Sequence, residues 1–105
     1  MPNEYIYRPG LEHAYLVCCD IADPRRWYKA FRAMKGFGEW LQLSVFHCRL
    51  SKQKHLLMQD CLGEMINRKE DHLLIIDLGL ADSVQLRVEN MGRPFDPIRK
   101  DPIIV

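Results

Sequence analysis

The sequence has little excess charge of either sign and no long hydrophobic run. Fifteen Lys and Arg residues stand against 14 Asp and Glu residues, which gives a formal net charge of +1 over 105 residues. Total charge therefore does not indicate a nucleic-acid-binding protein, and any basic surface must come from local clustering. No segment is apolar enough to span a bilayer, and the initial Met-Pro-Asn-Glu lacks the features of a signal peptide. We expect one cytoplasmic domain without a membrane partner.

Cysteine pairs at metal-binding spacing are also missing. The four cysteines are Cys18, Cys19, Cys48 and Cys61, and no two of them have CxxC spacing. Disulfides are not expected in a reducing compartment. One alternative is a zinc site built from Cys48, His47 and one cysteine of the adjacent pair, but ligand pairs at zinc-finger spacing are absent. Buried, small, apolar thiols are the better interpretation.

The most informative segment joins an apolar strand to an acidic corner and a basic helix. Residues 14–19 form an uninterrupted apolar run, which is typical of a strand buried on both faces, and Asp20 closes it. Asp23 followed by Pro24 predicts a helix N-cap and a proline at the first helical position. Two interpretations of Asp20 stay open. It either accepts backbone hydrogen bonds or is a hard oxygen ligand for Mg²⁺, for which Asp23 is less suited because capping occupies it.

The helix that follows this corner is predicted to be amphipathic. Its apolar stripe has the i, i+3, i+4, i+7 spacing of a helix lying on a sheet and consists of Trp27, Ala30, Phe31 and Met34. Arg25, Lys29 and Arg32 share the opposite side. Such a basic face is usually only solvated. Here it begins beside Asp20, which favours contact with phosphate groups.

Two glycines and a serine mark the next boundaries. Gly36 and Gly38 are expected to stop the first helix, since glycine tolerates the left-handed conformation that often ends one. Residues 39–50 are rich in aromatic and branched side chains but too long for one ordinary strand. We therefore expect two strands with a break near residues 43–44. Ser51 then caps a second helix.

The second helix and a further strand complete the pattern. The predicted apolar face of this helix consists of Leu57, Cys61, Leu62, Met65 and Ile66. Its first turns carry Lys52, Lys54 and His55, cations that oppose the helix dipole unless an anion or acidic partner approaches. A polar turn at 67–71 leads into an apolar strand at 72–78.

This order of elements predicts an α+β fold, the ferredoxin-like βαββαβ unit with both helices on one face of an antiparallel sheet. We expect residues 1–13 to be a lead-in, 14–78 the ferredoxin-like domain, and 79–105 a C-terminal arm in which 83–89 forms a short strand. The helix-free face of the sheet needs a cover, and a second copy is the simplest one, so we expect a homodimer. The arm is predicted to pack on the partner protomer as an added edge strand.

Two segments carry a resemblance to a known family. The first is the apolar strand ending Cys-Asp-Ile, followed by Ala-Asp-Pro-Arg-Arg. The second reads Gly-Phe-Gly-Glu-Trp-Leu-Gln-Leu-Ser-Val-Phe-His-Cys-Arg-Leu-Ser. Together they resemble the CRISPR-associated Cas-two (Cas2) family over the stretch from Tyr15 to Leu78. The combination of Tyr-x-x-x-x-Asp-Ile with Gln-x-Ser-Val-Phe is the most specific part.

The resemblance implies a ferredoxin-like homodimer that takes part in spacer acquisition, bridges subunits of the Cas-one (Cas1) integrase and supports duplex DNA. Many members of the family are described as Mg²⁺-dependent nucleases. The resemblance therefore also implies an endonuclease that hydrolyses RNA or DNA phosphodiesters, with Mg²⁺ or Mn²⁺ as cofactor and single-stranded RNA as a further partner. Asp20 falls on the family's catalytic, metal-binding aspartate, and two copies would pair it at the twofold axis. The candidate nucleic-acid contacts are Arg25, Arg26, Lys29 and Arg32.

The sequence also departs from the family pattern. His47 stands where many relatives carry an acidic residue, so that carboxylate is absent here. No general base accompanies Asp20 in the sequence, so its turnover is expected to be slow or absent. The functions weighed are an architectural adaptation subunit, a metal-dependent endonuclease, and a non-catalytic regulatory or ligand-binding dimer of the same fold. The first two are compatible, and we favour the adaptation subunit with nuclease activity as a secondary property.

Overall fold

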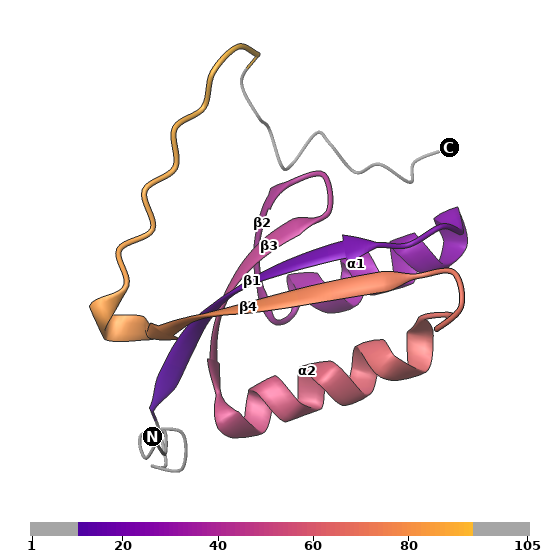
Figure 1. Ribbon diagram of the computed structural model, residues 1–105, viewed down its shortest axis with the longest axis horizontal. Helices are drawn as coiled ribbons and strands as arrows, with labels where there is room; N and C mark the ends of the chain where they lie inside the picture. The colour runs from indigo at the N-terminus through magenta and orange to yellow at the C-terminus, as the bar shows by residue number, and fades with distance from the viewer. Residues whose placement is uncertain (1–10, 94–105) are drawn as a thin grey trace.

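The structure is a computed structural model that describes residues 11–93 (Figure 1). Expectations for most of the lead-in and for 94–105 lie outside the described residues. Along the described chain the helices and strands are β1 (Glu12–Asp20), α1 (Pro24–Lys35), β2 (Gly38–Gln42), β3 (Val45–Ser51), α2 (Lys52–Met65) and β4 (His72–Leu80), followed by a 3₁₀ turn at Ala81–Ser83.

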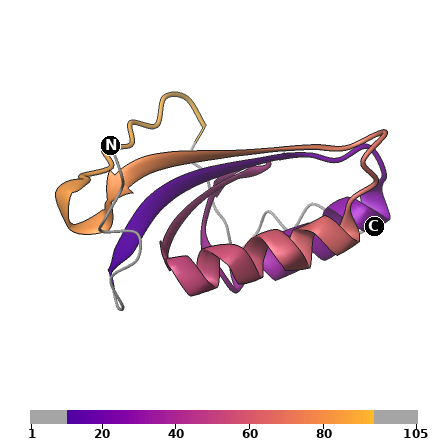
Figure 2. The same cartoon turned by 60° about the horizontal axis from the view of Figure 1, so that its bottom comes forward.

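The four strands form one antiparallel sheet in the order β2-β3-β1-β4. Both helices lie on the same face of this sheet (Figure 2). This arrangement confirms the predicted α+β, ferredoxin-like fold. The strands extend from Glu12 to Leu80, slightly beyond both ends of the segment 14–78 expected from the sequence. In the described part of the chain, no helix is long and apolar enough to cross a membrane.

Side-chain caps start both helices where the sequence predicted them. The Asp23 carboxylate accepts a hydrogen bond from the backbone N–H of Arg26 at 2.9 Å. The Ser51 hydroxyl accepts one from the N–H of Lys54 at 3.2 Å. These bonds satisfy N–H groups that have no partner within the helix. The predicted end of the first helix at Gly36 is confirmed, since α1 ends at Lys35 and Gly36 is its C-cap. The expected left-handed conformation is wrong, because Gly36 is right-handed with φ −81° and donates its N–H to the Ala33 carbonyl.

The core lies between the sheet and the two helices. Its fully buried side chains are Phe46, Met34, Leu50, Met58, Leu62, Val17 and Cys48. The predicted stripe of α1 is confirmed, since Phe31 and Met34 are buried. The predicted face of α2 is correct at Leu62 but wrong at Leu57, which is 56% exposed. Each residue turns a helix by roughly 100°, and α2 is rotated so that Met58 points at the sheet in place of Leu57.

The helix-free face of the sheet is only partly covered. Side chains alternate along β1, so that Val17 and Cys19 are buried toward the helices while Leu16 and Cys18 are half-buried on the other face. The expected burial of this strand on both faces is therefore wrong for a single chain. On β4, Leu74 and Ile76 share the helix-free face and are 46% and 38% exposed. Apolar side chains on an uncovered sheet face are a candidate interface.

The hairpin between β2 and β3 turns at Leu43 and Ser44, as predicted. Leu43 has a positive φ of 42°, which is unusual for a residue other than glycine. Its carbonyl accepts a hydrogen bond from the indole N–H of Trp40 at 2.8 Å, which holds the turn against the core. Gly38 lets β2 approach β3 closely, because a Cβ at this position would collide with the thiol of Cys48.

The chain leaves the sheet after β4. Residues 81–83 form the 3₁₀ turn, and the remaining described residues have no regular secondary structure. Figure 1 shows this segment running away from the sheet. The strand expected at 83–89 is therefore wrong within this chain. The alternation of apolar residues there is real, but a strand needs a neighbour, and the turn directs the segment away from its own sheet.

Candidate functional site

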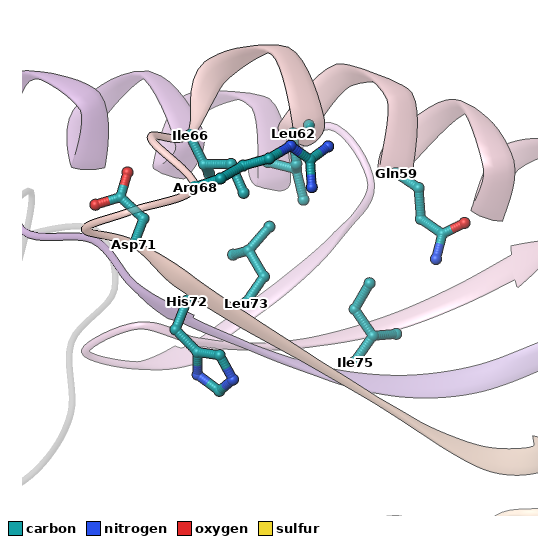
Figure 3. Close-up of a pocket in the computed structure, with 9 residues that line it drawn as sticks. Gln59, Leu62, Ile66, Arg68, Asp71, His72, Leu73 and Ile75 are labelled. Atoms are coloured by element: carbon teal, nitrogen blue, oxygen red, sulfur yellow. The ribbon is translucent and has the colours of Figure 1, made fainter.

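Asp20 is the last residue of β1 and is exposed to solvent. Across the sheet it pairs with His72, the first residue of β4. Directly opposed residues of an antiparallel pair have side chains on the same face. Figure 3 shows the His72 ring pointing away from α2, toward the helix-free face. His72 is thus a neighbour of Asp20 that sequence reasoning missed, since only the strand register brings the two together.

A buried carboxylate fixes the corner that follows Asp20. The side chain of Asp71 has no exposed surface. Its oxygens accept hydrogen bonds from the N–H of Ala22 at 2.9 Å and the N–H of Asn67 at 2.7 Å. They also accept from Nε of Arg26 at 2.8 Å and from Nη2 at 3.1 Å. One carboxylate therefore joins the loop after β1, the start of α1 and the turn before β4.

Arg26 belongs to this structural cluster. Its side-chain hydrogen bonds hold the pKa of Asp71 well below the usual range of an aspartate, and the same bonds raise the pKa of Arg26. A second carboxylate, Glu70, accepts from Nη2 of Arg26 at 2.9 Å. Of the four cations expected to contact phosphate, Arg26 is thus already engaged by two carboxylates. The sequence alone does not indicate this role, because the partners Glu70 and Asp71 lie 44 and 45 residues away from Arg26.

The other three cations of α1 that were expected to contact phosphate remain available. Arg25, Lys29 and Arg32 are exposed and make no ion pair with any described residue. The guanidinium of Arg32 lies over the ring of Tyr28, 5.6 Å from its centroid. Such a contact limits the side-chain motion of the arginine while its charge still faces solvent. The structure therefore brings three of the four predicted contacts to one helix face.

The carboxylates around the corner differ in their availability to a metal ion. Asp23 is occupied by the helix cap, and Arg26 engages Asp71 and Glu70. The Asp20 carboxylate makes no hydrogen bond or ion pair with another described residue, although its backbone pairs with His72 in the sheet. Within residues 11–93 no group of three or more His, Cys, Asp or Glu side chains could hold a metal. Mg²⁺ requires only one or two protein carboxylates, so Asp20 fits it as one half of a pair.

The thiols do not favour the zinc alternative. Burial raises the pKa of Cys19 to about 12 and that of Cys48 to about 11. Because zinc binds the thiolate, these protonated thiols are poor ligands at neutral pH. Cys19 and Cys48 are buried, whereas Cys18 and Cys61 are half-buried, and all four are free. The two buried thiols pack as small core side chains.

A second polar cluster lies at the opposite end of β1. Nδ1 of His13 is 2.9 Å and 3.0 Å from the two carboxylate oxygens of Asp77. Tyr15 stacks on His55 of α2, with ring centroids 4.5 Å apart. Burial lowers the pKa of His55. These contacts attach the start of α2 to the sheet, far along β1 from Asp20.

Comparisons with known proteins agree with this fold. The model of the CRISPR associated protein Cas2 family matches residues 13–85. The chain belongs to the Cas2 family. A Cas2 protein of Rhodospirillum rubrum, named a CRISPR-associated endoribonuclease, is 46% identical over 93% of this chain and 96% of its own length. One from Geobacter sulfurreducens with the same type of name is 47% identical over 90% of this chain and its entire own length.

Solved structures of other Cas2-like chains have the same architecture. Streptococcus pyogenes Cas2 superposes with a TM-score of 0.66 at 25% identity and covers 75% of this chain and 99% of its own. A hypothetical protein from Thermus thermophilus gives a TM-score of 0.65 at 29% identity, covering 80% of this chain and 96% of its own. The Cas2 fold thus extends over the part of the chain that carries Asp20 and α1.

We expect Asp71→Asn to lower the melting temperature by several degrees, since it weakens the bonds to Arg26. The folded-state pKa of Asp71 is depressed. Its contribution to stability is therefore complete above the unfolded-chain value of about 4 and is lost as pH falls through the lower folded value. Thermal unfolding followed by circular dichroism from about pH 2 to 7 should show a smaller acid loss in the variant than in the wild type.

Asp60→Asn is the matched control, because Asp60 is exposed on α2 and makes no hydrogen bond with a described residue. It should follow the wild-type curve. An Asp71→Asn curve parallel to the wild type over the whole acid range would contradict the role assigned to Asp71.

Proposed function

We propose that this Cas2 protein is a homodimeric subunit of CRISPR spacer acquisition that binds duplex DNA, bridges subunits of the Cas1 integrase and carries a Mg²⁺-dependent endonuclease site at the dimer axis. The observation that carries the proposal is the position of Asp20. It is exposed at the end of a strand whose helix-free face is apolar and uncovered. The same surface therefore offers an interface and the carboxylate that a second copy would pair.

The dimer follows from the uncovered face. Leu74 and Ile76 are exposed beside the half-buried Leu16 and Cys18 on one continuous face of β1 and β4. Burial of apolar surface in an interface contributes a favourable free energy of roughly 25 cal/mol per Å². A twofold interface uses the same patch on both copies. Asp20 shares this face of β1 with Leu16 and Cys18, so an isologous contact around this end of the strand would bring two Asp20 carboxylates together.

The endonuclease activity rests on the names of the relatives and on the chemistry of paired carboxylates. When bound, Mg²⁺ supplies Lewis-acid polarisation of a phosphate oxygen and activation of water. Asp20 would hold the ion, and the backbone that follows it is fixed by the hydrogen bond from the Ala22 N–H to the Asp71 carboxylate. This bond limits the movement of the loop beside the proposed metal ligand. Mn²⁺ prefers similar oxygen ligands and is expected to replace Mg²⁺.

The DNA-binding role rests on α1. Arg25, Lys29 and Arg32 form an exposed basic face that starts beside the Asp20 corner. Side-chain contacts to phosphate position a duplex without reading its sequence, which is what an architectural subunit requires. The bridging of Cas1 and the packing of the C-terminal arm on the partner protomer follow from family membership and from the length of chain beyond the sheet.

Asp20→Asn should reduce Mg²⁺-dependent cleavage of labelled single-stranded RNA or duplex DNA by at least about 100-fold, because a carboxylate ligand is lost. Asp60→Asn, prepared identically, should cleave like the wild type and exclude a contaminating nuclease. EDTA should stop both active proteins. Equal cleavage by Asp20→Asn and wild type would contradict a metal site at Asp20. Retained spacer acquisition by the inactive variant would favour the scaffold as the biological role.

Combined alanine substitution of Arg25, Lys29 and Arg32 should weaken duplex DNA binding by at least about tenfold at moderate salt. It should also reduce the slope of log affinity against log salt by about 3 per chain, since each lost phosphate contact releases one counterion fewer. Fluorescence anisotropy over a salt series measures both quantities. The Asp20-dependent cleavage site is untouched by these substitutions.

The control for this experiment changes the same total charge elsewhere on the surface. It replaces three exposed cations outside α1 with alanine: Lys54, Arg87 and Arg93. If this control lowered the affinity and the salt slope as much as the α1 variant, the binding would depend on net charge and the α1 interface would be wrong.

A further inference from the structure

The proposed metal ligand Asp20 has an imidazole beside it. Asp20 and His72 are opposite each other in the pair of β1 and β4, and both are exposed. Side chains of directly opposed residues lie on the same face of a sheet, with Cβ atoms roughly 4.5–5.5 Å apart. The ring of His72 points away from α2, toward the helix-free face (Figure 3). A carboxylate and an imidazole at this separation can bind one metal ion between them.

The backbone is fixed on both sides of this pair, while the two side chains remain available. The N–H of Ala22 after β1 and the N–H of Asn67 before β4 both donate to the carboxylate of Asp71, which directly precedes His72. Within residues 11–93, the Asp20 carboxylate and the His72 ring make no hydrogen bond or ion pair, either with each other or with a third residue. Available ligands on a fixed backbone favour metal binding, because little conformational freedom is lost when the ion binds.

One chain supplies two ligands at this corner, and no set of three or more ligand side chains within its described residues could hold a metal. We infer that Asp20 and His72 of two copies together bind one divalent transition-metal ion. Imidazole suits transition metals such as Zn²⁺, Fe²⁺ and Ni²⁺, whereas Mg²⁺ takes oxygen ligands and binds here through the carboxylates alone. The inference rests on the proposed dimer and its metal site, and it adds the second ligand and the class of ion that the site prefers.

The other histidines are placed differently. His47 of β3 shares the helix-free face, but it pairs with Leu16, which is four residues along β1 from Asp20 and therefore roughly 13 Å away. The two remaining histidines belong to the polar cluster at the opposite end of β1. A change of His47 thus keeps the residue type and the face of the sheet while changing the position, which makes it the matched control.

The metal affinity of the full chain tests the inference independently of cleavage. Isothermal titration calorimetry uses two probes: Co²⁺, which lies between Fe²⁺ and Ni²⁺ in affinity for such ligands, and Mg²⁺. His72→Thr should weaken Co²⁺ binding at least about tenfold and Mg²⁺ binding less than about twofold, because it removes only the imidazole ligands. Threonine suits a strand, so the fold is expected to persist. His47→Thr should bind both ions like the wild type.

A second readout identifies the ligand atoms in the wild-type protein. Imidazole bound to Co²⁺ gives strongly shifted proton NMR signals, and ¹⁵N labelling of histidine assigns them to that residue type. These signals should appear in the wild type and in His47→Thr but not in His72→Thr. Their absence from the wild type would overturn the inference, as would an equal loss of Co²⁺ affinity in the two variants. A charge-transfer band of Co²⁺ bound to a thiolate would also overturn it, since it would assign the ion to a cysteine.

These outcomes separate the inference from the proposed function. If Co²⁺ binding requires both Asp20 and His72 but Asp20→Asn cleaves nucleic acid like the wild type, the shared metal site stands and the endonuclease activity is wrong. If Asp20→Asn abolishes metal binding and cleavage while His72→Thr binds Co²⁺ normally, the carboxylate site stands and the inference is wrong. One Co²⁺ per chain in a protein of single-chain mass would contradict both.

Discussion

The hydrogen-bonded pair of Asp71 and Arg26 is the interaction on which the functional end of this protein depends. Burying the Asp71 carboxylate without hydrogen-bond donors would carry a large desolvation cost. Its four hydrogen bonds come from the loop after β1, the start of α1 and the turn before β4, so these three segments must lie together for the carboxylate to be satisfied. The same pairing determines which charges remain available. It engages Arg26 and Glu70, and it leaves Asp20 and Arg68 without partners among the described residues.

The sheet divides this corner into two sides with different chemistry. On the helix-free side, Asp20 ends an apolar surface that suits a second copy of the chain. On the helix side, a hollow between α2 and β4 is lined by both apolar and polar side chains, Arg68 among them.

The sequence was sufficient for the fold, since each boundary has a local chemical signal. Asp23 with Pro24, and Ser51, mark the helix starts, and the apolar spacing of α1 gives its buried face. The failures occur where tertiary structure decides. Neither the exposure of Leu57 nor the loss of the expected strand at 83–89 has a local cause. At the site, Asp20 and the α1 cations could be named from the sequence. The pairing of Arg26 with Asp71 and the nearness of His72 could not, because they depend on strand register across more than 40 residues.

The proposed function depends on a dimer in which the helix-free faces of two chains meet and two Asp20 carboxylates are paired. Sedimentation equilibrium of the full chain at micromolar concentration tests it most directly. We expect twice the 12.4 kDa of one chain for the wild type and a single-chain mass for Leu74→Glu, which places a charge on that face. Leu57→Glu, on the exposed side of α2, should remain a dimer. A single-chain mass for the wild type, or a dimer unaffected by Leu74→Glu, would contradict the proposed dimer through the helix-free face.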